Sequence, residues 1–407
     1  MSQRAVLLLG NTSAAVTLAR DLKREGYKLI CSVEGEEGGA EHSRDVDELW
    51  GHRPVAGDPE GFLRDLEAVL RERPEISVVY PVSDAFLQVL VTHRNSLPAG
   101  PVYAMPPADL VNAAADRLNL LSLAVLNQVP TEPFEMVETP AAFLQAVQRI
   151  GLPLVVYPAR AGAARTGEVC ETLADLQTAV HGLSGSMWPL VLQRKGRGRC
   201  HCITFAAQNG ALVRYGEMAI VRTDRTKGWG KPVEGKTVQP TRSLQRHLER
   251  LTKAMSYTGA GCARFLVNEA DGTLSFLDLS AHIPADLAVS EASGLKLSTL
   301  AISLAQHPHD RVPYREGKVG IHAVSSAEDL NAAKRAYLQG EVSAAESLSW
   351  VCEAVSAAVR ADIHLAWSWR DPLPGVFALV EILPSLQGTL RWMWQWQRLG
   401  PKVWHGS

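Results

Sequence analysis

Residues 259–282 read GAGCARFLVNEADGTLSFLDLSAH, in which two mostly apolar runs flank the turn-forming pair Asp271-Gly272. An Asp-Gly pair between such runs predicts a β-hairpin, here with strands over Cys262–Asn268 and Leu274–Leu279. A second hairpin is predicted upstream, where Asn209-Gly210 separates two more apolar runs. The middle of the chain is therefore expected to contain antiparallel sheet.

The segments around these hairpins complete an α+β pattern. Strands are predicted over Cys200–Ala207 and Leu212–Val221, and helical periodicity covers Leu244–Tyr257. A longer helical pattern, Leu287–Gln306, is interrupted by Gly294. Upstream of the hairpins, further helices and strands are predicted over Ala108–Asn127, Thr139–Ile150, Leu154–Tyr157 and Leu190–Gln193.

The first 110 residues show a different pattern, in which short apolar runs alternate with amphipathic helices. Strands are predicted over Ala5–Leu9, Lys28–Val33, Ile76–Tyr80 and Pro101–Met105, with helices over Ala14–Glu25 and Phe62–Arg71. Alternation of this kind predicts a parallel sheet with helices on both faces, which is a Rossmann-like domain.

Two polar residues follow the third strand, at the edge where open α/β sheets bind ligands. Ser83 and Asp84 come directly after Pro81-Val82. Asp84 is also a favourable N-cap for the helix that follows. A substrate-binding role and a capping role are both open. Gly10, before Thr12 and Ser13, is compatible with a phosphate-binding turn, but a plain strand-to-helix turn is favoured because no G-x-G-x-x-G motif is present.

The composition excludes several classes of protein. The 407 residues are 46% apolar and 21% charged, with a formal net charge of −2, which does not suit a general nucleic-acid binder. Six sparse cysteines imply no disulfide framework. The apolar run at the N-terminus is too short for a signal peptide, and no apolar stretch is long enough to span a membrane. The expected location is the cytoplasm.

The order of these elements resembles the ATP-grasp superfamily, particularly its carbamoyl-phosphate-synthetase-like carboxylate–amine ligases. The landmarks that carry the resemblance are Val79–Asp84, Ala115-Asp116-Arg117, Gly151–Pro158, Val191–Arg194, Gly259–Phe265, Phe276–His282 and Trp367–Pro374. The resemblance implies α/β and α+β architecture: a Rossmann-like domain over 1–110, then an ATP-grasp domain of two α+β subdomains over 111–310, hinged near 190–196. Residues 311–407 would be a helical C-terminal extension with a Trp-rich end.

The resemblance also implies a reaction and its cofactors. Such ligases use ATP and Mg²⁺ to phosphorylate a carboxylate, and an amine then attacks the acyl phosphate. For this chain, the resemblance to this subgroup suggests a role in the biosynthesis of a cell-surface or secondary metabolite. A small or anionic ligand would bind in the central cleft.

Site residues follow from the landmarks, and most depart from the usual pattern. Arg117 and Tyr157 stand where two phosphate-binding lysines are usual, and Gly162, Gln193 and Arg194 would line the nucleotide site. Asp278 and Ser280 stand at metal-ligand positions and share one face of a strand. His282 replaces an arginine and is the candidate proton donor.

The altered positions leave two interpretations open. Arg264 stands where the first metal carboxylate is usual, so it either repels a metal or forms a cross-strand ion pair with Asp278, and the ion pair is favoured. An active ligase with rearranged groups and a catalytically inactive pseudo-ligase that binds or scaffolds partners are both compatible with these residues.

Three further segments have alternative roles. Residues 194–236 contain ten Lys/Arg and three Asp/Glu, a difference of +7, and Arg225 lies in their loop as a candidate catalytic cation, although a solvated loop is equally compatible. Cys200-His201-Cys202 suits strand packing better than a metal site. The Trp-rich segment Arg391–Arg398 suits contact with the inner membrane face, with a partner protein or with the body of the molecule.

Overall fold

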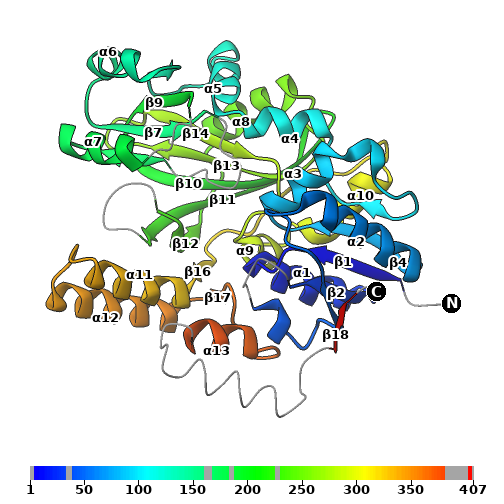
Figure 1. Cartoon of the computed structure of the whole chain (residues 1–407). Coiled ribbons are helices and arrows are strands. Elements are labelled where there is room, and N and C mark those ends of the chain that lie inside the picture. The colour runs from blue at the N-terminus through cyan, green and yellow to red at the C-terminus, as the bar shows by residue number, and fades with distance from the viewer. Residues whose placement is uncertain are drawn as a thin grey trace.

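A computed structural model describes residues 4–33, 39–159, 167–182, 188–224, 230–380 and 402–405. Its strands form three sheets, and Figure 1 shows the lead sheet on one side of the molecule and the other two sheets above it. Among the described residues, no helix combines the length and the apolar character that crossing a membrane requires.

The lead domain is built on a parallel sheet in the strand order β18-β3-β2-β1-β4-β5. Its strands are β1 (Ala5–Leu9), β2 (Lys28–Ser32), β3 (Glu48–Gly51), β4 (Ile76–Pro81), β5 (Val102–Tyr103) and β18 (Lys402–His405). Its helices are α1 (Ser13–Arg24), η1 (Ala40–His42), α2 (Pro59–Glu72), α3 (Asp84–Thr92) and η2 (Arg94–Ser96). The Rossmann-like prediction is confirmed, whereas β3 and β18 are strands that the sequence pattern does not predict.

The smaller of the next two sheets has four strands, paired antiparallel in the order β6-β9-β7-β8. They are β6 (Phe134–Val137), β7 (Leu154–Pro158), β8 (Glu168–Cys170) and β9 (Leu190–Arg194), and the helices α6 (Pro140–Ile150) and α7 (Leu173–Gly182) accompany them. Phe143 and Ile150 of α6 pack with strand residues such as Val156 and Leu192 to form a small core of its own.

The large sheet follows the order β14-β13-β10-β11-β12-β16-β17, with β15 paired to β11. Its strands are β10 (Arg199–Gln208), β11 (Ala211–Thr223), β12 (Pro232–Thr237), β13 (Gly259–Val267), β14 (Leu274–Ser280), β15 (Arg315–Glu316), β16 (His322–Val324) and β17 (Ile363–His364). One face carries buried Phe205, Phe265 and Phe276, which pack with Leu248 and Leu251 of α8 (Arg242–Ala254).

The helix predicted over 108–127 is wrong as a single element, because the chain breaks at Asp116. The structure has α4 (Ala108–Ala115) and α5 (Arg117–Leu126). Asp116 has extended backbone angles, and its side chain accepts a hydrogen bond of 2.9 Å from the Asn119 amide, which makes it the N-cap of α5. The break places Arg117 in the first turn of α5, where its side chain contacts Gln193 and Tyr157 of the small sheet.

The remaining helices follow β14, and α9 (Leu287–Ala292) and α10 (Leu297–Gln306) lie between the large sheet and the lead domain. The break predicted at Gly294 is confirmed, because Gly294 lies between these two helices. The C-terminal extension contains α11 (Ser326–Leu338), α12 (Ala344–Arg360) and α13 (Leu373–Val380). Figure 1 shows α11 and α12 side by side at the edge of the molecule, with α13 beside the lead domain. The extension supplies strands to the large sheet through β15–β17 and to the lead sheet through β18.

Candidate functional site

Three of the predicted nucleotide-site residues meet between the small sheet and the large sheet. The Arg117 Nη2 donates a hydrogen bond of 2.8 Å to Gln193 Oε1, and the guanidinium carbon lies 3.4 Å from the centre of the Tyr157 ring. Tyr157 is 7% exposed, so this is a largely desolvated cation–π contact. Burial raises the pKa of the Tyr157 hydroxyl, and the positive charge of Arg117 only partly opposes this. The tyrosine is therefore neutral and holds Arg117 by its ring.

Two donors in this cluster have no hydrogen-bond partner. Among the described residues, Arg117 Nε and Gln193 Nε2 are buried and unsatisfied. A buried donor without an acceptor costs about 1–3 kcal/mol, so a bound oxygen-rich group would be favoured here. The cavity lined by Arg117, Tyr157 and Asp278 has a volume of about 20 Å³, which is room for about one water molecule. The arrangement fits an anionic or polar ligand group chemically, and space for a whole nucleotide requires the two sheets or their side chains to separate.

The expected magnesium ligands have a different environment. Asp278 Oδ1 and Oδ2 each accept a hydrogen bond of 3.0 Å from Arg264 Nε, and Arg264 Nη2 makes a third contact with the same carboxylate. The charge of Asp278 is the main reason that the pKa of Arg264 is raised. The cross-strand ion pair predicted from the hairpin is confirmed.

This arrangement does not fit a magnesium site. The side chain of Asp278 is only 8% exposed in its ion pair, and the described part of the chain contains no cluster of three or more His, Cys, Asp or Glu that could hold a metal. A metal role for Asp278 and Ser280 therefore requires Arg264 to release the carboxylate first, and it stays a prediction.

Three thiols lie on the same face of the large sheet as this ion pair. Cys202 is paired across the strands with Arg264, and Cys262 is paired with Ser280. Cys202 packs with Met218 and Ile220 in the strand interior, as the preference for strand packing expects. A hydrogen bond from the Cys202 thiol, together with the charge of Arg264, holds the pKa of the Cys200 thiol below its ordinary value.

His282, Ser83 and Asp84 form a second group, where the large sheet meets the lead domain. His282 Nε2 lies 3.4 Å from Asp84 Oδ1, and His282 Nδ1 lies 2.8 Å from the Ile283 carbonyl oxygen. Asp84 is not the N-cap of α3, because Ser83 has the extended cap conformation and Asp84 is the first helical residue. The capping expectation for Asp84 is therefore wrong. The carboxylate instead faces the ring of His282.

Unpartnered polar atoms gather near this group. β1 and β4 are neighbours in the lead sheet, and the connection after β1 leads to β2 on one side while the connection after β4 leads to β5 on the other. The gap between two such strands is the switch point, where open α/β sheets bind ligands. Thr12 Oγ1, Ser83 Oγ and Tyr80 Oη are buried there without a partner among the described residues. Burial raises the pKa of the Tyr80 hydroxyl, and the negative charge of the Glu291 carboxylate raises it further. Sequence reasoning identified Ser83 but missed Tyr80, because a tyrosine within an apolar strand run gives no functional signal.

Of the other predicted site residues, Arg194 does not join either group. Arg194 donates from Nε and Nη2 to the Ile150 carbonyl oxygen at 3.0 and 2.7 Å, so it closes the end of α6 rather than lining the nucleotide cluster. Gly162 and Arg225 lie outside the described residues. Tyr157 and Asp278 share one cavity, whereas His282 lines another, so the three do not converge on a single cleft.

Two arginines of the basic middle segment are held by partners within the fold. Arg222 donates from Nε to Glu234 and from Nη2 to Asp329, both at 2.6 Å. Arg214 is buried and donates to backbone carbonyl oxygens, including that of Leu295 at 2.9 Å. Arg222 therefore holds β11, β12 and α11 together, and Arg214 ties β11 to Leu295, shortly before α10.

Comparisons with known proteins identify the fold. No family model matches the chain. A formate-dependent phosphoribosylglycinamide formyltransferase from Photobacterium profundum is 28% identical over 178 residues, which are 43% of this chain and 42% of that relative. The match thus spans about two fifths of the relative's length.

Similar solved structures cover more of the chain at lower identity. A biotin carboxylase from Campylobacter jejuni, in a beta-gamma-ATP complex, has a TM-score of 0.62 at 17% identity over 78% of this chain and 74% of that one. An N5-carboxyaminoimidazole synthetase from Staphylococcus aureus has a TM-score of 0.61 at 12% identity, covering 83% and 86%. An L-amino acid ligase from Bacillus licheniformis has a TM-score of 0.57 at 14% identity, covering 75% and 74%. These neighbours share the ATP-grasp fold.

Proposed function

We propose that this chain, which has the ATP-grasp fold, is an ATP-dependent ligase that joins a carboxylate to an amine through an acyl phosphate. The nucleotide would lie between the small and large sheets, against Arg117, Gln193 and Tyr157. The observation that carries the proposal is the pair of buried, unpartnered donors, Arg117 Nε and Gln193 Nε2, among the residues proposed to hold the nucleotide. Two of the solved neighbours are nucleotide complexes, one with beta-gamma-ATP and one with ADP.

The substrate would bind where the lead domain meets the large sheet. Ser83 and Asp84 lie at the switch point of the lead sheet, next to the unpartnered hydroxyls of Thr12 and Tyr80. A carboxylate at Asp84 suits an amine, and hydroxyl donors suit an anionic oxygen. His282 contacts Asp84 and would hold a proton at this end of β14.

Phosphoryl transfer requires positive charge beside the transferring group. Arg117 and Arg264 are cations whose charges both act on the Tyr157 hydroxyl. Magnesium adds positive charge in sites that hold it, but Asp278 is paired with Arg264 here. Biosynthesis of a cell-surface or secondary metabolite, and contact of the Trp-rich end with a membrane face or a protein, are parts of the proposal that rest on the sequence.

The test measures nucleotide binding and turnover separately. Isothermal titration with ATP, with and without Mg²⁺, should show binding to the wild type. Arg117→Ala should weaken that binding roughly tenfold or more, because hydrogen bonds to charged groups contribute about 1.5–3 kcal/mol. Arg246→Ala, an exposed arginine on α8, is the matched control and should bind as the wild type does. ADP release with a panel of carboxylic acids and amines should then be detectable.

The proposal fails if the wild type shows neither heat nor a thermal shift with ATP under either condition. Binding without ADP release would favour the second candidate, a pseudo-ligase that serves as a binding or scaffolding partner. The Arg264–Asp278 ion pair favours that candidate, because it occupies a carboxylate that the chemistry uses. A Tyr157→Lys/Arg264→Glu double variant that gains magnesium-dependent ATP binding would support a site that has lost its activity.

A further inference from the structure

A second cavity, lined mainly by apolar residues, lies away from the nucleotide cluster, between α3, α10 and the first residues of β13. Its volume is about 320 Å³, within the range of small-molecule sites. Figure 1 places α3, α4 and α10 together on the side of the molecule opposite α6 and α7. The nucleotide-side cavity is lined by the other end of α4, around Ala114, and by earlier residues of β14. The two cavities are therefore separate.

Small side chains create the space in this cavity, which we call the alanine pocket. Its lining includes Ala104, Ala108, Ala260, Ala281, Ala301 and Ala305, together with larger apolar residues such as Leu87 of α3 and Leu304 of α10. The polar side chains in the wall are mostly engaged. Tyr103 donates to the Pro98 carbonyl oxygen at 2.9 Å, and Thr258 Oγ1 accepts from the Asn209 amide at 2.9 Å. The pocket thus offers an apolar interior with little demand for hydrogen bonds.

The mouth of the alanine pocket has the opposite character. Arg94, Tyr103 and Ala305 also line an adjoining open groove of about 580 Å³, which contains Arg4 and His307. Within the described residues, the side chains of Arg4 and Arg94 make no ion pair, and none of the residues lining the pocket or the groove is acidic. In a molecule with net charge −2, two unpaired arginines at one opening form a local anion-attracting field.

We propose that the alanine pocket and its basic groove bind an amphiphilic anion, with an apolar tail inside and a carboxylate or phosphate head at Arg4 and Arg94. The tail gains from leaving water for an interior that requires no polar partner. The head remains partly hydrated at the mouth, where an arginine pairs with it at little desolvation cost. This ligand would be distinct from the nucleotide. His282 lines the pocket and also contacts Asp84, so the pocket adjoins the proposed substrate site, but binding of the amphiphile requires no ligase turnover.

Isothermal titration of the full chain tests this with defined probes. Octanoate and octyl phosphate should bind, octan-1-ol should bind several-fold more weakly, and acetate and inorganic phosphate should show no binding. Shortening octanoate by one methylene should weaken binding roughly fourfold, because each buried methylene contributes a near-constant increment. The tighter of the two octyl anions identifies the head group as a carboxylate or a phosphate.

Two variants separate the tail from the head. Ala305→Trp should fill the pocket and weaken octanoate and octan-1-ol alike by tenfold or more. Arg94→Gln should weaken octanoate roughly two- to fivefold, the effect of an exposed charge pair, and should leave octan-1-ol unchanged. Arg246→Gln removes an exposed arginine outside the site and should change neither. Circular dichroism verifies folding, and Arg94→Gln, which alters only an exposed side chain, remains informative if Ala305→Trp does not fold.

The inference is overturned if octan-1-ol binds the wild type as tightly as octanoate, or if a folded Ala305→Trp retains wild-type affinity. An equal loss with Arg94→Gln and Arg246→Gln would also overturn it, because it would show a general charge effect. Absence of binding by both octyl anions would end the proposal, whatever the outcome of the ATP titrations.

Discussion

Arg117 shows how one substitution changes the role of its neighbours. The resemblance places a lysine at position 157, which would repel the charge of Arg117 in the absence of a nucleotide. Tyr157 instead offers the face of its ring at 3.4 Å, so the arginine is held without any bound anion. The contact stabilises the ligand-free state, and a nucleotide has to displace it or adapt to it.

Asp278 is the residue whose substitution best tests the ion pair. Asp278→Asn should lower the free energy of unfolding by about 2 kcal/mol. The reason is that the charge of Arg264, which is only 29% exposed, loses its partner. Chemical denaturation in urea measures the loss. A double variant with Arg264→Leu should be more stable than Asp278→Asn alone, since no unpaired charge remains.

The control is Glu269→Gln on the same hairpin, where Glu269 pairs with Arg199 at 3.1 Å and is 63% exposed. It should cost less than about 1 kcal/mol. If Asp278→Asn costs no more than this control, the ion pair does not stabilise the fold and the carboxylate is available for another role.

At the scale of elements, Glu217 joins two strands to a helix. This buried carboxylate on β11 accepts hydrogen bonds from Tyr215 Oη at 2.8 Å and from both the amide and the hydroxyl of Thr241 at 2.7 Å. His201 Nδ1 on β10 is 2.7 Å away. Burial alone would raise the pKa of Glu217, but these contacts outweigh it and hold the pKa below its ordinary value of 4.5. The group therefore stays ionised and fixes the start of α8.

A pH-dependent loss of stability follows from this depressed pKa. The contribution of Glu217 is fully present above pH 4.5 and is lost as the pH falls through the lower, folded-state value. Glu217→Gln should cost about 2 kcal/mol at pH 7, because an amide cannot accept all of these bonds. Urea unfolding should show the gap between variant and wild type narrowing from pH 6 to pH 3. The exposed Glu249→Gln on α8 should show no such narrowing, and a constant gap for Glu217→Gln would contradict the argument.

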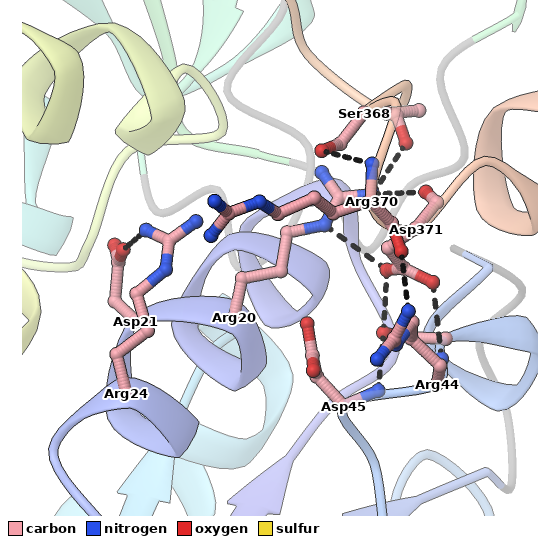
Figure 2. Close-up of polar contacts among 10 residues, drawn as sticks. Arg20, Asp21, Arg24, Arg44, Asp45, Ser368, Arg370 and Asp371 are labelled. Atoms are coloured by element: carbon pink, nitrogen blue, oxygen red, sulfur yellow. Dashed lines mark hydrogen bonds and ion pairs between the residues drawn. The ribbon is translucent and has the colours of Figure 1, made fainter.

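At the scale of the whole molecule, a buried carboxylate from the C-terminal extension anchors that extension to the lead domain. Asp371, with a side chain only 2% exposed, accepts hydrogen bonds from Arg20 Nε at 3.0 Å, Ser43 Oγ at 2.7 Å and the Arg44 amide at 3.0 Å (Figure 2). Arg20 also donates to the Ala366 carbonyl oxygen at 3.0 Å. Residues more than 300 positions apart are thus bonded directly, and α13 is positioned beside η1 by this contact.

Removing this anchor should loosen the extension before it unfolds the rest. Asp371→Ala should cost about 3 kcal/mol, because Arg20 is left buried without its carboxylate. Hydrogen exchange should increase selectively in residues 363–380, and limited proteolysis should cut there first. Asp310→Ala, at an exposed aspartate, is the control and should change neither. Unchanged exchange in 363–380 would show that other contacts hold the extension.

The features that sequence alone determined are local ones. Turn pairs such as Asp271-Gly272 and interruptions such as Gly294 define hairpins and helix ends, because backbone preferences act between near neighbours. The Arg264–Asp278 ion pair was predictable for the same reason, since a short hairpin sets its own register. The order of these elements was enough to indicate the ATP-grasp fold. The break at Asp116 was missed because the surrounding Ala- and Leu-rich segment has a high helical propensity. Capping by Asp116 and tertiary packing outweigh that propensity.

Tertiary structure alone decided which distant residues meet. Arg117, Tyr157 and Gln193 come from a helix and two strands. Asp371, near the C-terminal end of the chain, bonds to the lead domain. β18, at the same end, pairs with β3. The alanine pocket likewise exists only where α3, α10 and β13 pack together. Such contacts depend on the placement of whole elements, and no local pattern of residues encodes that placement, so the sites they form became visible only in the folded molecule.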